Sequence, residues 1–247
     1  MPSTYYNRMI SYLGGGKLGD FIHGLIVCKY NFEILGEKAD LYIANKGDIF
    51  ETSLESTYKG LYPILIKQDW INSFNIYNKE SIDVNLIKFR DSKLLYKTNW
   101  IELYFHEFLP NVVPPKEYSW IDLEIDGKYS NSLIVNRSNK WMSNVAISSY
   151  EEIFQNYDEI YFICYKEHLS QYDNFPLKNK CQLLIVDNLY DYFIKLKSCK
   201  MFLGNQSGAT AWATSMNVPR ITELYGKDAN FCYNDINYYS NFTYFKG

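Results

Sequence analysis

Short apolar runs alternate with helix-like segments through the second half of this chain, and this alternation restricts the fold more than any other feature. Five runs are expected to form strands, at 132–136, 159–165, 182–186, 200–203 and 220–224. Three segments with helical spacing of apolar residues are expected to form helices, at 149–157, 189–198 and 207–216. Strands separated by helices predict a parallel sheet with helices on both faces.

The last part of this alternation, 201–225, contains a turn with a glycine on each side. An apolar run meets Gly204, then the polar residues Asn205, Gln206 and Ser207, then Gly208 and a helical segment. Glycine lets a ligand approach the backbone closely, and a helix that starts at Ser207 points N–H groups and the positive end of its dipole at that ligand, for which a phosphate is favoured. Ser207 is also a good N-cap, so a helix start that binds nothing is an equal alternative.

The first half of the chain opens with the same order of strand, turn and helix. An apolar run at 8–13 precedes a glycine-rich turn, and a helical segment at 21–35 leads to a second strand at 39–44, so we expect a βαβ unit. Gly14, Gly16 and Gly19 fit the pattern G-x-G-x-x-G. After a strand and before a helix, that pattern indicates a turn that contacts phosphate.

Two known nucleotide motifs fit this turn incompletely. The second strand leads to Asn45, where a dinucleotide site needs an acid for the ribose, and Asp40 lies at the beginning of that strand. A Walker loop is excluded because Lys17 precedes the last glycine and no Ser or Thr follows a G-K pair. What remains is a glycine-rich turn that carries an acid, Asp20, with His23 three residues later on the same helical face.

The middle of the chain is less regular. We expect a helix near 49–58, strands at 61–67 and 82–89, and an amphipathic helix near 99–109. Two prolines and a polar, glycine-containing stretch then place the link between two halves within 111–130.

The chain is therefore predicted to form two domains, 1–127 and 128–247. Near the link, Asp122, Glu124 and Asp126 alternate along the sequence. Alternation on a strand places all three on one solvated face, which explains them more simply than a metal site does.

Composition narrows the classes of partner. With 25 basic and 28 acidic residues and a net charge of −3, the chain has no electrostatic reason to bind nucleic acid or an anionic membrane. No apolar run is long enough to span a membrane, and the N-terminal residues lack the apolar core of a signal peptide, so we expect no transmembrane segment and a cytoplasmic protein. The cysteines are odd in number and scattered without C-x-x-C spacing, which favours a reducing compartment and no zinc site: Cys28, Cys164, Cys181, Cys199 and Cys232.

The polar residues that follow the strands of the second half are expected to form one site. Parallel sheets of this kind bind ligands beyond the carboxyl ends of their strands. Arg137 and Lys140 follow the first of these strands, the 206–208 segment follows a later one, and Glu223 lies at the end of the last. Each alone is an ordinary surface residue, but their shared location favours a common role.

Two blocks of sequence resemble those of one family. LGDFIH at 18–23 is similar to the L-G-D-x-x-H motif of the ADP-heptose:lipopolysaccharide heptosyltransferases, of glycosyltransferase family 9. FLGNQSGATAWATSMNVPRI at 202–221 is similar to that family's G-N-D-S-G block with its following helix and G-V-P. The resemblance implies an α/β GT-B glycosyltransferase, with two Rossmann-like parallel-sheet domains facing a cleft. It further implies that the C-terminal domain mainly holds the nucleotide sugar and the N-terminal domain mainly holds the acceptor.

The resemblance also implies roles for single residues. The acid of the first motif corresponds to Asp20 and would be the catalytic base. The late block would contact the donor through Asn205, Gln206, Ser207 and Gly208. A basic residue after the first strand of the second domain would contact phosphate, and Lys140 is the best match, with Arg137 as its neighbour. Gln206 stands where the family usually has an acid, which removes a charge from the donor site and leaves the identity of the sugar open.

The chemistry of glycosyl transfer suits these residues. The reaction needs a base for the acceptor hydroxyl and positive groups for the departing diphosphate. Asp20 supplies the first, and Arg137, Lys140 and the helix at 207 supply the second, so the D-x-D metal motif that the sequence lacks is not required. We expect an inverting, metal-independent hexosyl- or heptosyltransferase with a nucleotide sugar as co-substrate and no other cofactor. Its acceptor would be a glycan, a lipid-linked molecule or a protein.

Further roles are expected for four residues. His23 would orient Asp20 or touch the acceptor, although a lone histidine on a helix is more often packed or solvated. Glu223 would hold ribose or sugar hydroxyls. Gly16 and Gly19 would lie against the donor.

Two alternatives to an active glycosyltransferase stay open. One is a catalytically inactive GT-B-like module that binds a sugar or a protein. The other is a nicotinamide-dependent oxidoreductase, which the G-x-G-x-x-G pattern favours and the missing acid after the second strand opposes.

Overall fold

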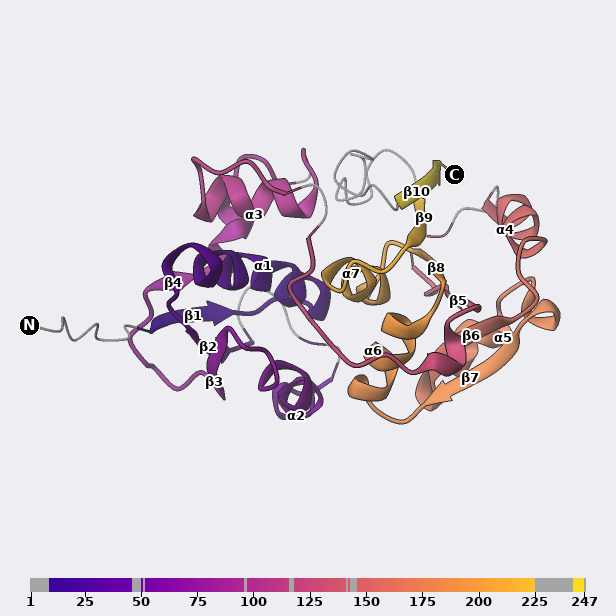
Figure 1. The fold of residues 1–247 in the computed structure, drawn as a ribbon, viewed down its shortest axis with the longest axis horizontal. Coiled ribbons are helices and arrows are strands. Elements are labelled where there is room, and N and C mark those ends of the chain that lie inside the picture. Colours follow the sequence, from indigo (N-terminus) through magenta and orange to yellow (C-terminus); the bar gives the residue numbers. More distant parts are fainter. Residues whose placement is uncertain are drawn as a thin grey trace, which may run out of the picture. The chain divides into compact units, whose positions relative to one another are not determined.

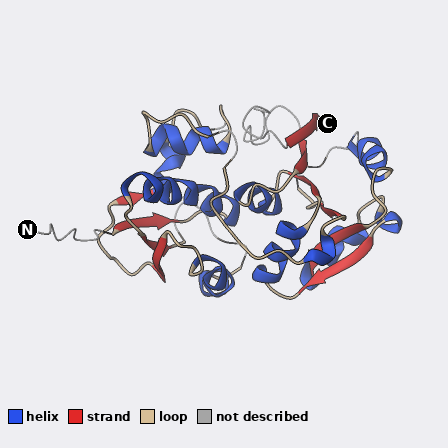
Figure 2. Ribbon diagram, viewed as in Figure 1, coloured by secondary structure: helices blue, strands red, loops and turns tan. Residues whose placement is uncertain are grey.

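The structure, a computed structural model, describes residues 9–45, 50, 52–95, 97–115, 118–140, 142, 146–224 and 242–246. The chain divides into two compact units, one made of Met1–Leu95 with Leu103–Val112 and one of Tyr96–Glu102 with Val113–Gly247. Each unit contains one sheet, with four strands in the first and six in the second. All paired strands are parallel within the described residues, so the predicted class, α/β with two parallel sheets, is confirmed (Figures 1 and 2).

The first sheet has the strand order β3-β2-β1-β4. Its strands are β1 Ile10–Gly14, β2 Ala39–Ile43, β3 Ile71–Ile76 and β4 Val84–Asn85. Its helices are α1 Leu18–Leu35, α2 Leu54–Leu65 and, from Leu103 onward, α3 Trp100–Phe108. Because β1 is paired on both edges, the glycine-rich turn at its carboxyl end lies at an inner position of the sheet.

Helix α1 follows that turn and packs through the first half of its length. Every residue from Phe21 to Cys28 is buried. The helix ends at Gly36, whose φ of 72° suits glycine and whose N–H donates to the Phe32 carbonyl oxygen. The helix predicted at 21–35 is confirmed, and the structure starts it earlier, at Leu18.

The middle of the chain differs from the prediction. The strand expected at 61–67 is wrong, because α2 continues to Leu65 through Pro63, with Leu61, Ile64 and Leu65 buried at helical spacing. Strand β3 was not predicted, since its sequence INSFNI buries only every third residue. The strand expected at 82–89 is reduced to the two residues of β4, and a 3-10 helix, Leu86–Asp91, follows it.

The second sheet has the order β10-β9-β8-β5-β6-β7 and confirms the alternation in the sequence. Its strands are β5 Leu133–Asn136, β6 Ile160–Tyr165, β7 Gln182–Val186, β8 Met201–Asn205, β9 Arg220–Leu224 and β10 Phe242–Lys246. Its helices are α4 Ala146–Phe154, α5 Leu169–Asp173, α6 Leu189–Ser198 and α7 Gly208–Ser215. Only α5 and β10 were not predicted among these elements, and Cys232 lies outside the described residues.

The segment between the halves belongs to the second unit. The backbone N–H groups of Trp120 and Ile121 both donate to the Ser215 carbonyl oxygen at the end of α7, at 2.9 and 3.1 Å. The second unit therefore resumes at Val113, within the predicted link at 111–130 but before the predicted boundary at residue 127. Asp122, Glu124 and Asp126 are exposed as expected, although this segment is not a strand.

Within the described ranges, no helix has the length and apolar character to cross a membrane. The same residues contain no group of three or more His, Cys, Asp or Glu side chains placed to hold a metal ion. The four described cysteines, Cys28, Cys164, Cys181 and Cys199, are free thiols.

Candidate active site

The turn after β1 depends on its glycines. Gly16 has a φ of 88°, and a Cβ placed there would lie 2.9 Å from both Asp20 Oδ2 and Arg90 Nη2. A Cβ on Gly14 would lie 2.7 Å from the Phe21 ring. The predicted strand, turn and helix are confirmed, and the glycines serve close packing around Asp20.

Asp20 lies in the first turn of α1, and its carboxylate has two described partners. Its Oδ2 accepts a hydrogen bond from the Lys17 backbone N–H, 3.2 Å away, so the side chain caps the helix although it lies inside it. Arg90, in the 3-10 helix after β4, donates from Nη2 to the same oxygen at 2.6 Å. The ion pair is partly accessible, with 26% of the Arg90 side chain and 14% of the Asp20 side chain exposed.

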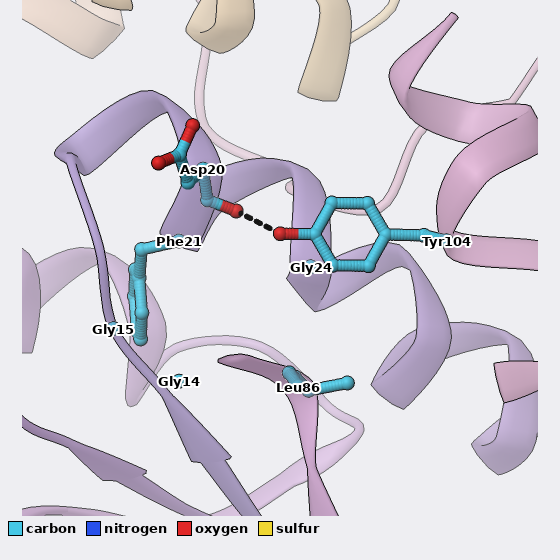
Figure 3. Close-up of a pocket in the computed structure, with 7 residues that line it drawn as sticks. All are labelled: Gly14, Gly15, Asp20, Phe21, Gly24, Leu86 and Tyr104. Atoms are coloured by element: carbon cyan, nitrogen blue, oxygen red, sulfur yellow. Dashed lines mark hydrogen bonds between the residues drawn. The ribbon is translucent and has the colours of Figure 1, made fainter. Parts of the chain in front are cut away.

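Tyr104 of α3 fixes the backbone beside Asp20. Its hydroxyl donates to the Asp20 carbonyl oxygen at 2.8 Å. Burial raises the pKa of Tyr104 well above its usual value, and the charge of Asp20 adds to the shift, so the hydroxyl stays protonated as the donor. Figure 3 shows the Asp20 carboxylate turned away from this bond and from Leu86.

Asp20 and Tyr104 line a small pocket in the first unit. Its other lining residues are Gly14, Gly15, Phe21, Gly24 and Leu86 (Figure 3). As it stands, the pocket is too narrow for a water molecule. A ligand of Asp20 must therefore approach from the exposed side of its carboxylate.

The structure places His23 inside α1. His23 is 2% exposed, and its Nδ1 lies 2.8 Å from the carbonyl oxygen of Gly19, one turn earlier in the helix. This arrangement fits the packed alternative better than contact with an acceptor. Gly16 and Gly19 lie with Asp20 in the first unit, whereas the other predicted donor-binding residues lie in the second.

In the second unit, Asn205 joins the carboxyl ends of β5 and β8. Its Oδ1 accepts from the Ser138 backbone N–H at 3.0 Å, and its Nδ2 donates to the carbonyl oxygens of Ser138 and Lys140. The Lys140 residue is exposed. The structure thus brings Asn205 to the backbone of Lys140 and adds Ser138 to them.

Arg137 and Glu223 also meet, but with each other. Arg137 Nε and Nη2 donate to the two carboxylate oxygens of Glu223, at 2.7 and 2.8 Å, and the side chains are 6% and 0% exposed. Tyr150 donates its hydroxyl to Glu223 Oε2 at 3.0 Å. Burial alone would lower the pKa of Arg137, but its hydrogen bonds to Glu223 and the charge of that carboxylate raise it, so the arginine stays charged.

The N-terminus of α7 is the remaining part of this edge. Ser207 occupies the N-cap position but its side chain makes no capping hydrogen bond, and among the described residues its buried Oγ has no hydrogen-bond partner. Thr210, in the first turn, donates from Oγ1 to the Asn205 carbonyl oxygen. Among the described residues, a Cβ on Gly208 would meet only the Trp212 ring, at 4.0 Å, so the packing of these residues does not require glycine there. Gln206 is 5% exposed.

No protein-family model matches this sequence, and comparison with curated proteins finds no relative. Solved structures do match its fold. The E. coli heptosyltransferase WaaC with ADP has a TM-score of 0.64 and 10% identity, over 97% of this chain and 93% of that one. The chain has the fold of heptosyltransferases. E. coli ADP-heptose lps heptosyltransferase II agrees, with a TM-score of 0.57 and 12% identity over 96% of this chain and 90% of that one.

A glycosyl transferase of family 9 from Veillonella parvula shows the same likeness. Its TM-score is 0.58 at 11% identity, over 98% of this chain and 88% of that one. At such identities the comparisons establish the fold alone. At that level they confirm the resemblance that the two sequence blocks indicated, including the GT-B class.

The sequence did not reveal four residues that build these sites. Arg90 and Tyr104 reach Asp20 from elements far along the chain, and no local pattern marks them. Tyr150 reaches Glu223 from α4 in the same way. Ser138 had a usable signal, because it directly follows Arg137 beyond a buried strand.

Proposed function

We propose that this chain is a glycosyltransferase that moves a sugar from a nucleotide-sugar donor to an acceptor hydroxyl. The observation that carries the proposal lies at the edge of the second sheet. There Asn205 is hydrogen-bonded both to the loop of Lys140 and to Thr210 in the first turn of α7. This edge lies beyond the carboxyl ends of parallel strands, where sheets of this kind bind ligands. The fold supports the proposal, because it is shared with a heptosyltransferase whose structure was determined with ADP.

The donor's diphosphate would bind between Lys140 and the N-terminus of α7. The N–H groups of Gly208 and Ala209 have no carbonyl partner within a helix that starts at residue 208, and the helix dipole favours an anion there. Lys140 adds a positive charge on an exposed side chain. Gly208 carries no side chain that would obstruct a phosphate, and its packing against the described residues does not demand a glycine at that position.

Arg137 and Glu223 would support this site structurally, as a buried ion pair. Each satisfies the other's charge, and Glu223 has no exposed surface. Direct contacts of Arg137 with phosphate and of Glu223 with sugar hydroxyls require this pair to open. We therefore assign phosphate binding to Lys140 first.

Asp20 would be the base of the reaction. Its carboxylate takes the proton of the acceptor hydroxyl, the acceptor oxygen bonds to the anomeric carbon, and the bond from that carbon to the diphosphate oxygen breaks. The nucleoside diphosphate leaves with the bonding electrons, and Lys140 and α7 stabilise its growing charge. A single displacement of this kind inverts the anomeric centre, and it needs no metal or further cofactor. The sugar is a hexose or heptose, and the protein would act in the cytoplasm on a glycan, lipid-linked or protein acceptor.

The test is a comparison of diphosphate and nucleoside binding. We expect Lys140→Ala to weaken ADP binding by about tenfold or more, because a charge-assisted hydrogen bond is lost, and to leave adenosine binding unchanged. Isothermal titration calorimetry measures both, with UDP and GDP titrated in parallel. Lys128→Ala is the matched control, since this exposed lysine precedes β5 and lies at the opposite end of that strand.

Catalysis is tested with a panel of nucleotide sugars, by measuring the nucleoside diphosphate released with and without candidate acceptors. If Lys140→Ala lost equal affinity for ADP and for adenosine, the diphosphate would not bind at this edge of the sheet. Binding of a nucleoside diphosphate without turnover of any donor would favour the inactive module instead.

A further inference from the structure

The side chain of Asn205 is bonded to the loop that contains Ser138 and Lys140. The residue is 0% exposed. Besides the three bonds to the backbone of Ser138 and Lys140, its Oδ1 and Nδ2 lie 3.3 and 3.1 Å from the Ser138 hydroxyl. A carboxamide has two donor hydrogens and one acceptor oxygen with two lone pairs, so these contacts occupy its bonding capacity.

The backbone of Asn205 is bonded to the other half of the site. Its carbonyl oxygen accepts from the hydroxyl of Thr210, in the first turn of α7. One buried residue therefore connects the loop that carries Lys140 with the helix start that carries Ser207 and Gly208.

Close packing of two strands makes this connection possible. β5 and β8 are adjacent, with Asn136 opposite Gly204. A Cβ on Gly204 would lie 2.7 Å from the Asn136 carbonyl oxygen and 2.6 Å from the Phe202 ring, so a side chain there would push the strands apart. Gly204 thus holds the end of β8 close enough for the next residue to reach Ser138.

We propose that Asn205 is a positioning residue for the donor's diphosphate, which holds Lys140 at the N-terminus of α7 without contacting the donor itself. The proposal rests on the proposed function, since it deepens the same site. It differs from the donor contact that the sequence suggested for this residue, because the amide is buried and directed at the loop. Lysine is a flexible point charge, so a fixed backbone at Lys140 restricts where its ammonium group can lie.

The test is a double-mutant cycle on ADP affinity. Wild type, Lys140→Ala, Asn205→Ala and the double variant are titrated with ADP by calorimetry, with UDP and GDP in parallel. We expect each single substitution to weaken binding by about tenfold, as for one lost charge-assisted contact, and the double variant to bind no more weakly than Lys140→Ala alone. Asn205 is proposed to act on ADP binding only by holding the Lys140 loop in place. Once the Lys140 side chain is absent, Asn205→Ala therefore has no further effect on ADP affinity.

Asn136→Ala is the control for a purely structural role. Asn136 is also a buried asparagine at the end of a strand, and its Nδ2 donates to the Ile163 carbonyl oxygen and to Gln171 Oε1, away from the Lys140 loop. We expect it to lower the melting temperature as Asn205→Ala does but to keep wild-type ADP affinity. Trypsin cleavage after Lys140 gives a second measurement without any ligand. It should accelerate in Asn205→Ala and not in Asn136→Ala.

The outcomes separate the two proposals. Multiplicative losses in the double variant would show that Asn205 acts on the nucleotide independently of Lys140, and unchanged affinity in Asn205→Ala would show a structural role only. Either result overturns the positioning role and leaves the proposed function intact. Failure of the wild type to bind any nucleoside diphosphate overturns both. If Asn205→Ala does not fold, Asn205→Asp replaces it, because aspartate keeps the acceptor bonds to Ser138 and loses the two donated to the carbonyl oxygens.

Discussion

In the part of the chain that the structure describes, each unit contains an arginine–carboxylate pair near the carboxyl end of a central strand, and the two pairs differ in burial. Arg90 Nη2 lies 2.6 Å from Asp20 Oδ2, and the two side chains are 26% and 14% exposed. Arg137 and Glu223 make two contacts at 2.7 and 2.8 Å, with side chains 6% and 0% exposed.

The difference indicates which acid is available for chemistry. A fully buried, two-point pair satisfies both charges and resists opening, because either partner left alone would be an uncompensated charge in a medium of low dielectric. The partly exposed pair of Arg90 and Asp20 holds the carboxylate in place and leaves part of it accessible to solvent. The difference therefore supports the proposed roles, a structural one for Glu223 and that of the base for Asp20.

The largest expected effect is that of Asp20→Asn on the rate. Asparagine can still accept the Lys17 N–H but cannot take a proton from the acceptor, so turnover should fall by roughly 10²–10⁴-fold. ADP affinity and melting temperature should change little. Steady-state kinetics with a donor identified from the nucleotide-sugar panel measures the fall in turnover. Wild-type turnover in Asp20→Asn would show that Asp20 only caps the helix.

The next largest effect is that of Glu223→Gln on stability. Arg137 would stay buried without its counter-charge, so the free energy of unfolding should drop by about 3–5 kcal/mol. Urea unfolding measures it. Tyr150→Phe, which removes one hydrogen bond to the same carboxylate, should cost only about 0.5–1.5 kcal/mol. If Glu223→Gln proves as mild as Tyr150→Phe, the contrast between the two pairs does not hold.

A smaller effect on stability, with a distinct effect on pH dependence, is expected for Arg90→Gln. Because the pair is partly exposed, the free energy of unfolding should fall by less than about 1 kcal/mol. Loss of the guanidinium makes ionisation of Asp20 less favourable, and the base works only when ionised. The acidic limb of the kcat/KM profile should therefore move to higher pH. Lys88→Gln, an exposed lysine of the same 3-10 helix, should leave the profile in place.

The smallest expected effect is that of a chelator. In the proposed site, Lys140 and the α7 N-terminus would provide the positive groups that a bridging metal otherwise supplies to the diphosphate. Transfer measured in EDTA should therefore match transfer without it. Loss of activity in EDTA with recovery on adding Mg²⁺ or Mn²⁺ would contradict this account of the site.

The sequence predicted those parts of the fold that local spacing determines. The alternation in the second half and the turn after β1 were correct, because glycines and apolar periodicity mark them directly. The segment at 61–67 was not, since LYPILIK is apolar enough for either a strand or a buried helix face, and tertiary packing selects the helix. Strand β3, on the sheet edge beside β2, is half polar and buries only Ile71 and Phe74, so its sequence shows no alternation of apolar and polar residues.

The residues of the candidate site also divide into those that local sequence marks and those that only the fold brings together. Asp20 and the 205–208 block were found from short motifs. The partners of these residues, Arg90, Ser138 and Tyr104, are separated from them by 70, 67 and 84 positions, and only the folded chain brings them together. Pairing of Arg137 with Glu223 is of the same kind, which is why both were first expected to face the ligand.

Trp212 gives the second unit an internal optical signal. Trp212 is 5% exposed, and its indole stacks on the Phe193 ring with 4.6 Å between the ring centroids. Its Cζ2 lies 4.0 Å from the position that a Cβ on Gly208 would occupy. An anion seated at the start of α7 would lie within the range over which charge alters indole emission. We expect nucleoside diphosphates to change the fluorescence of the wild type and to change it less in Trp212→Phe, because Trp141, next to Lys140 in the sequence, still emits.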